Sequence, residues 1–160
     1  MLQLTKRTEY GLIALVHMVD QVGEFVSVRE ICERYPVPKR LLAEVLKDLG
    51  RAGIVESQRG AAGGYALAKS ADEVTLGEIV AALEGAPTMT SCESLAPAKN
   101  GECEVEATCP IRSPIHVIRE SIWRLMQRTS LRSIADYPDA DYPSQVAIQS
   151  DHDPLLSRTN

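Results

Sequence analysis

The feature that most constrains the fold is a glycine-rich segment at residues 59–64, Arg-Gly-Ala-Ala-Gly-Gly, between two short runs that suit β-strands. Residues 54–57 (Ile-Val-Glu-Ser) precede it and residues 65–67 (Tyr-Ala-Leu) follow it. Three glycines in six residues supply the positive φ angles that a tight hairpin tip needs. The sequence therefore predicts a β-hairpin with a glycine-rich tip.

Three helical segments precede this hairpin. Apolar residues at helical spacing predict helices at 5–20 and 39–53, and Ser27 with Glu30 forms a capping box that opens a short helix between them. Pro36 and Pro38 predict the turn before the third helix, because proline disfavours helical backbone in the residue before it. The order of helix, short helix, turn, helix and hairpin is that of a winged helix-turn-helix.

The second half of the chain holds two further predicted helices. A second capping box, Thr75 with Glu78, predicts a helix over 75–84. Residues 86–112 show no period, and a last helix is expected over 113–135. The fold class is thus mainly α with a small β-hairpin wing. The apolar stripe of the last helix consists of Ile115, Ile118, Ile122, Leu125 and Met126.

The charge distribution favours the first half of the chain as the part that contacts nucleic acid. The net charge is −5, but residues 1–69 carry ten Lys and Arg against eight Asp and Glu, whereas residues 70–160 carry seven against fourteen. In a winged helix-turn-helix, the N-terminal residues of the second helix of the motif enter the major groove, and an arginine on the wing can enter a minor groove. The alternative for the basic residues is a solvated helix face. The candidate DNA-binding residues are Lys39, Arg40 and Glu44 for base edges, Lys47 and Arg51 for phosphates, and Arg59, Gly60 and Gly63 at the wing.

The segment RAGIVESQRGAAGGYALAKSADEVTLGEIVAALEG and the opening LTKRTEYGLIAL resemble the bacterial regulators that include the iron–sulfur cluster regulator IscR and the nitric-oxide sensor NsrR. The resemblance covers about residues 1–135. It implies a homodimer on a pseudo-palindromic operator, with a long C-terminal helix that crosses between subunits. The alternative is that this helix packs on its own domain. The implied organisation is a winged helix-turn-helix domain (1–85), a cysteine-bearing cluster loop (86–112), a dimerisation helix (113–137) and a flexible tail (138–160).

Three of the four cysteines, Cys92, Cys103 and Cys109, lie within 18 residues in the segment between two predicted helices. Thiolates are soft ligands that suit zinc, copper and iron–sulfur clusters. The resemblance implies that these three bind a [2Fe-2S] or [4Fe-4S] cluster, although the gap of ten residues between Cys92 and Cys103 is longer than usual in the family. Unligated surface thiols are the alternative. Cys32 is expected to be a core residue instead.

A cluster held by three cysteines leaves one position for a fourth ligand. Some relatives use an acidic residue near the N-terminus of the partner subunit, and Glu9 matches that position. Other relatives use a histidine, but the matching positions hold Arg112 and Ile13. The alternative role for Glu9 is a favourable interaction with the positive N-terminal end of its own helix.

Catalysis is not expected, because the chain shows no nucleophile–base–acid set, phosphate-binding loop or paired carboxylates. We expect a cytoplasmic DNA-binding regulator that senses iron, redox state or nitric oxide through its cluster. Two alternatives stay open: a winged-helix regulator without a cluster, which senses by thiol oxidation or holds zinc, and an iron–sulfur protein with no DNA role.

Overall fold

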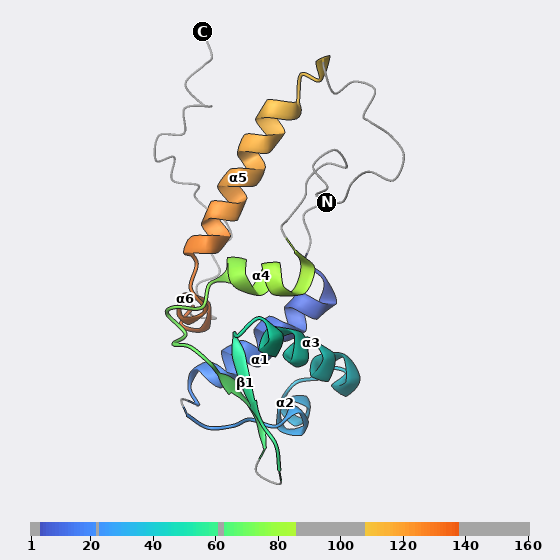
Figure 1. The fold of residues 1–160 in the computed structure, drawn as a ribbon, viewed down its shortest axis with the longest axis vertical. Coiled ribbons are helices and arrows are strands. Elements are labelled where there is room, and N and C mark those ends of the chain that lie inside the picture. Colours follow the sequence, from blue (N-terminus) through green and yellow to red (C-terminus); the bar gives the residue numbers. More distant parts are fainter. Residues whose placement is uncertain (1–3, 22, 61–62, 86–107, 138–160) are drawn as a thin grey trace.

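A computed structural model describes residues 4–21, 23–60, 63–85 and 108–137 of the chain. Within these residues the fold is mainly helical with one two-stranded sheet, which confirms the predicted fold class (Figure 1). The elements are α1 (Lys6–Val19), α2 (Val28–Arg34), α3 (Lys39–Arg51), β1 (Val55–Gln58), β2 (Gly64–Leu67), α4 (Leu76–Glu84), α5 (Arg112–Arg128) and α6 (Leu131–Ala135).

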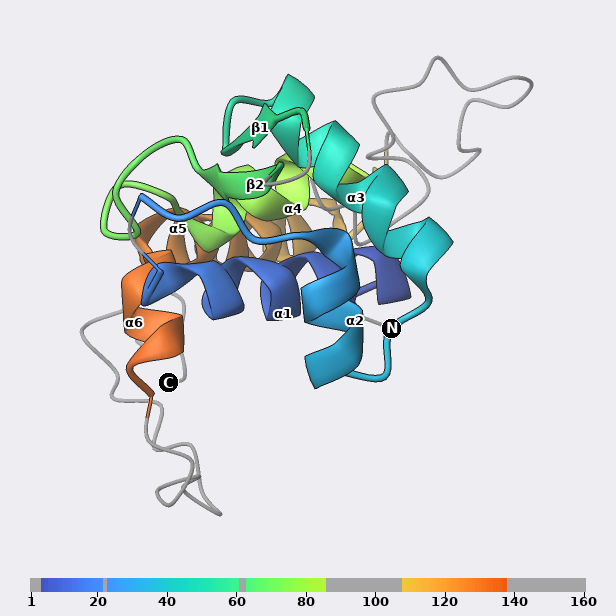
Figure 2. The same ribbon diagram turned by 90° about the horizontal axis from the view of Figure 1, so that it is seen from below.

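The core lies where α1 packs against α3, α4 and α6 (Figures 1 and 2). Leu15 of α1 and Ile79 of α4 are fully buried. Val37, in the turn between α2 and α3, is nearly so. Because α3 buries one face, its polar face is left exposed on the surface of the molecule. The buried residues of α3 are Leu42, Val45, Leu46 and Leu49.

The hairpin forms the predicted wing and gains a third short segment. β1 and β2 are antiparallel, with Val55 opposite Leu67 and Gln58 opposite Gly64. Val26 and Tyr65 then exchange two backbone hydrogen bonds, each 2.9 Å between nitrogen and oxygen. A Cβ atom at position 64 would lie 2.6 Å from the carbonyl carbon of Val26, so only glycine fits there. The wing is thereby attached to the segment that leads into α2.

The predicted single helix over 113–135 is wrong, because the helix breaks at Thr129 and Ser130. The Leu76 amide donates to the Thr129 carbonyl oxygen at 2.8 Å, and the Leu131 amide donates to the Val74 carbonyl oxygen at 2.8 Å. Leu131 is fully buried in the core. These long-range contacts replace the helical hydrogen bonds at the break and dock α6 onto the winged-helix body.

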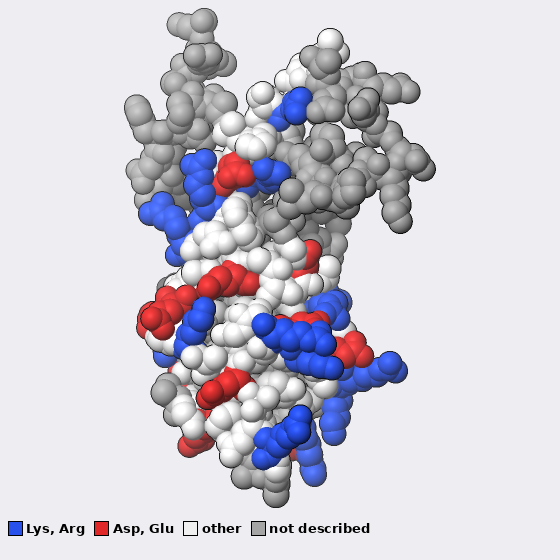
Figure 3. Space-filling view, viewed as in Figure 1, with Lys and Arg blue, Asp and Glu red and all other residues white. Residues whose placement is uncertain are grey.

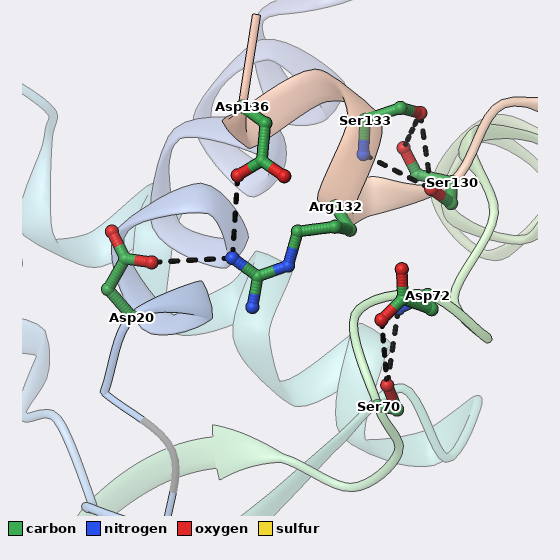
Figure 4. Close-up of polar contacts among 7 residues, drawn as sticks. All are labelled: Asp20, Ser70, Asp72, Ser130, Arg132, Ser133 and Asp136. Atoms are coloured by element: carbon green, nitrogen blue, oxygen red, sulfur yellow. Dashed lines mark hydrogen bonds and ion pairs between the residues drawn. The ribbon is translucent and has the colours of Figure 1, made fainter.

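Polar contacts complete the docking of α6 (Figure 4). The Ser130 hydroxyl accepts a hydrogen bond from the Ser133 amide at 3.1 Å, which caps the helix. Nη1 of Arg132 lies 3.4 Å from a carboxylate oxygen of Asp20 at the end of α1 and 3.4 Å from one of Asp136. Arg132 therefore ties α6 to the C-terminal end of α1.

Helix α5 projects from the body and has no buried residue (Figure 1). It contacts α4 at its base, where a Cβ atom at Gly77 would lie 2.7 Å from the Gln127 side chain. Its large apolar residues Ile118 and Leu125 are 43% and 66% exposed. Among the described residues, none of the helices is both long and apolar enough to cross a membrane.

Candidate nucleic-acid interface

The first turn of α3 is basic and has no side-chain cap. The N-cap residue is Pro38, which offers no side-chain hydrogen bond, and the turn contains no acidic residue. Lys39 and Arg40 occupy it and are exposed; the Arg40 side chain, 95% exposed, lies 3.3 Å from Glu44. Cations at the positive N-terminal end of a helix are unfavourable in isolation. An anion at this site would compensate both the basic side chains and the free amides.

A cleft of about 450 Å³ lies between the far half of α3 and the wing. Lys47 of α3 lines it, as do Arg59 and Gly63 of the wing. Ser27, the N-cap residue of α2, also lines it, and its hydroxyl accepts a hydrogen bond from the Glu30 amide at 3.1 Å. The remaining lining residues are Val28, Ser57, Gln58, Gly64 and Tyr65. The cleft therefore offers two cations and several hydroxyl or amide groups to a polyanion.

Arg51, the last residue of α3, is held in place by a carboxylate. Its Nη1 atom lies 2.7 Å from Oδ1 of Asp48, and Nη2 of Arg7 in α1 lies 2.6 Å from Oδ2 of the same residue. Sequence reasoning included Arg51 but missed Arg7 and Asp48, because no local pattern shows that α1 crosses α3 at this point.

The surface over α2 and α3 carries many basic side chains. Figure 3 shows Lys and Arg side chains there, with some Asp and Glu side chains among them, and further Lys and Arg side chains over α5. Gly60 has a φ of 115°, and a Cβ atom at Gly63 would lie 2.9 Å from the Gly60 carbonyl oxygen. Both glycines are thus needed for the shape of the wing tip, although residues 61–62 lie outside the described part of the chain.

Of the proposed cluster ligands, the structure describes Cys109 and Glu9. Cys109 is a half-buried free thiol that precedes α5, whereas Cys92 and Cys103 lie outside the described residues. The Glu9 carboxylate lies 2.5 Å from Nζ of Lys6 in the same helix. The hydrogen bond and the charge of Glu9 raise the pKa of Lys6 above its ordinary value. Within the described part of the chain, no group of three His, Cys, Asp or Glu side chains could hold a metal ion.

Comparison with known proteins decides the family. The profile of the Rrf2 family, described as "Iron-dependent Transcriptional regulator", matches residues 4–137. The chain belongs to the Rrf2 family of transcriptional regulators. It is therefore a DNA-binding regulator of the Rrf2 family and not an enzyme.

Individual Rrf2 proteins are similar over nearly the whole chain. A Rhodobacter capsulatus protein described as an Rrf2-like HTH-type transcriptional regulator is 31% identical over 151 residues, which are 91% of this chain and 99% of the relative. The structure of CymR, the global cysteine regulator of B. subtilis, is 28% identical with a TM-score of 0.67, over 87% of this chain and 100% of that one. The structure of IscR from T. potens, 22% identical with a TM-score of 0.62 over 97% and 96%, shares the fold.

Proposed function

We propose that this Rrf2 protein is a homodimeric, cytoplasmic regulator that senses iron, redox state or nitric oxide through an iron–sulfur cluster. Cys92, Cys103 and Cys109 would hold the cluster, which is of the [2Fe-2S] or [4Fe-4S] type. The observation that carries the proposal is the grouping of three cysteines within 18 residues, between the winged-helix body and α5.

The DNA-binding surface supports the first half of the proposal. An uncapped helix start with Lys39 and Arg40, and a cleft with Lys47 and Arg59, present cations at the places where a winged helix meets base edges and phosphates. Glu44 and Arg51 extend the same surface along α3. Double-stranded DNA is thus the partner that this geometry fits best.

The exposed stripe of α5 supports the dimer. Its isoleucines and Leu125 recur at alternating steps of three and four residues, which is the spacing of a helix–helix seam. A second copy of α5 would cover this stripe, and the two winged helices would then be related by a two-fold axis. A two-fold protein requires a pseudo-palindromic operator. The members of the stripe are Ile115, Ile118, Ile122, Leu125 and Met126.

The chemistry around Cys109 supports a thiolate-bound cluster. The thiol is half-buried and lies just before α5, whose N-cap residue Ile111 provides no side-chain cap. The N-terminal end of a helix favours negative charge, which thiolates bound to iron carry. When bound, a cluster supplies a redox-active centre at the junction between the DNA-binding body and α5.

Purification without oxygen tests the proposal directly. We expect visible absorption bands from sulfur-to-iron charge transfer, and iron and acid-labile sulfide in similar amounts per dimer. Chemical reconstitution with iron and sulfide under reducing conditions should give the same spectrum. A colourless protein that contains neither iron nor sulfide after both procedures would refute the cluster.

The similarity to CymR favours one alternative, a regulator without a cluster that senses by oxidation of its thiols. Zinc held by the same thiolates is a variant of this alternative, because zinc also prefers sulfur ligands. The same experiment separates the three: zinc without colour, no metal, or iron with sulfide. An iron–sulfur protein with no DNA role is disfavoured by membership of the Rrf2 family.

Glu9 of the partner subunit is the proposed fourth ligand. A carboxylate is a harder and weaker ligand for iron than thiolate, so it would leave readily and make the cluster responsive. Glu9→Ala should still assemble a cluster, with an altered spectrum and a changed rate of reaction with nitric oxide. Lys6→Ala is the control, since it removes the ion pair of Glu9 and keeps the carboxylate. Identical spectra and rates for Glu9→Ala and the unchanged protein would show that Glu9 is not a ligand. Its role would then be the favourable interaction of an acidic residue with the first turn of α1.

A further inference from the structure

Glu84, the last residue of α4, accepts hydrogen bonds from the first turn of α1. Its Oε1 atom lies 2.9 Å from the Thr5 backbone nitrogen and 2.9 Å from Thr5 Oγ1, and the fully buried Thr8 donates a third bond. Burial raises the pKa of Glu84, but these three hydrogen bonds outweigh burial and hold the pKa below its ordinary value. The carboxylate therefore ties the start of α1 to the end of α4.

The same turn of α1 holds α3 through one side chain. Arg7 stands between Thr5 and Thr8 in the sequence, and its guanidinium donates to Asp48, which also receives Arg51. Two guanidinium groups around one carboxylate leave this cluster with a net positive charge, so it can still attract a phosphate. Hydrogen bonds thus connect Glu84 to the first turn of α1, and a side chain of the same turn to the end of α3.

We propose that Glu84 is a positioning residue for DNA binding, which acts through Arg7 and Asp48 on Arg51. An arginine that is already held in place loses less side-chain entropy when it binds a phosphate. The inference rests on the proposed phosphate contact of Arg51. The same hydrogen bonds would connect the cysteine-bearing segment to α3, because Glu84 is two residues before position 86, where that segment begins.

The test measures the affinity of the full chain for duplex DNA and its dependence on salt. The probe is a duplex of about 30 base pairs selected from a randomised pool, long enough for two half-sites one helical turn apart. Glu84→Ala should weaken binding by about fivefold. The slope of log affinity against log salt concentration should fall by the amount expected for about one fewer phosphate contact per protomer. This loss is opposite to the effect of charge alone, because removing a negative charge strengthens attraction to DNA.

Two further variants distinguish positioning from general damage. Thr8→Val keeps the shape of the buried side chain and removes one donor to Glu84, so it should weaken DNA binding in the same direction. Asp48→Asn should do likewise, and the double variant Glu84→Ala/Asp48→Asn should be no weaker than the worse single variant, because both act through one chain of contacts.

Glu24→Ala is the matched control. It removes the same charge from an exposed position where no side-chain contact is seen in the described part of the chain, and it should not weaken binding. Equal affinity and salt slope for Glu84→Ala and Glu24→Ala, or additive losses in the double variant, would overturn the inference. If Arg51→Ala itself binds DNA as tightly as the unchanged protein, the proposed phosphate contact fails instead.

Discussion

Gly64 lies so close to Val26 that a Cβ atom at position 64 would stand 2.6 Å from the Val26 carbonyl carbon. The neighbouring atoms are backbone and cannot rotate away. Because the two backbone hydrogen bonds between Val26 and Tyr65 depend on this approach, the wing is attached to the body through a position without a side chain.

Gly64→Ala should therefore lower the free energy of unfolding by about 2 kcal/mol or more, through the lost strand contact. Gly50→Ala is the control: it lies within α3, and a Cβ atom there would meet its nearest neighbour at an ordinary 3.7 Å. That change should raise stability by about 0.5–1 kcal/mol through helix propensity. Urea titration followed by circular dichroism measures both, and equal stabilities would contradict the role of the close approach.

Lys39→Ala, Arg40→Ala and Arg59→Ala should each weaken specific DNA binding by about 1–3 kcal/mol, the size of one good contact. Base-edge contacts should also relax sequence preference, so the first two variants should tolerate operator changes that the unchanged protein rejects. Fluorescence anisotropy at several salt concentrations measures this. Lys69→Ala is the control, because Lys69 follows β2 and its Nζ atom lies 3.5 Å from a carboxylate oxygen of Glu78 in α4. Unchanged affinity in all three test variants would mean that another face binds DNA.

Cys92→Ser, Cys103→Ser and Cys109→Ser should each lose most of the iron and sulfide and alter DNA affinity, because a cluster needs its thiolates as a set. Cys32→Ser should keep the visible spectrum, since Cys32 packs partly buried against the core. Anaerobic spectra and metal analysis measure the outcome. Full iron content in all three single variants would exclude these cysteines as ligands.

Ile118→Asp and Leu125→Asp should convert the protein to a monomer, because each would place a charge in the seam between two α5 helices. Sedimentation equilibrium measures the mass, and DNA affinity should fall together with it. Arg124→Asp, at an exposed position of α5 that is not part of the stripe, is the control and should remain dimeric. A dimer that survives both seam substitutions would locate the contact elsewhere.

Glu84 should make stability depend on pH in the acid range. Its pKa is lowered in the folded protein, so its contribution is present above the ordinary pKa of a glutamate and is lost as the pH falls through the folded value. The difference in melting temperature between the unchanged protein and Glu84→Gln should therefore shrink between about pH 5 and pH 3. A constant difference over that range would show that ionisation of Glu84 does not matter.

Local patterns predicted most of the fold. The capping box of Thr75 and Glu78 is complete in the structure, with hydrogen bonds in both directions. The other box is only half formed, because Ser27 receives the Glu30 amide while the Glu30 carboxylate turns toward His17, 3.9 Å away. Caps and helical periodicity are properties of neighbouring residues, so one sequence can reveal them.

Features that depend on distant contacts could not be predicted in this way. The break at Thr129 exists because residues 74–76 compete for its backbone hydrogen bonds, and Leu131 has the same apolar character as the stripe before it. The candidate site divides likewise. Lys39, Arg40 and Arg59 stood out by position, whereas the pairing of Arg7 with Asp48 depends on how two helices cross.

The docking of Leu131 has a mechanical consequence. The chain leaves the winged-helix body at Gly85 and is fastened to it again at Leu131, so α5 is a rod clamped at its base. With 17 residues it is about 25 Å long. A small change in the angle of α5 at its other end, next to Cys109, would then be transmitted through this attachment to the winged-helix body. In the proposed dimer, such a change would alter the distance between the two DNA-binding domains, and with it the operator spacing that the protein prefers.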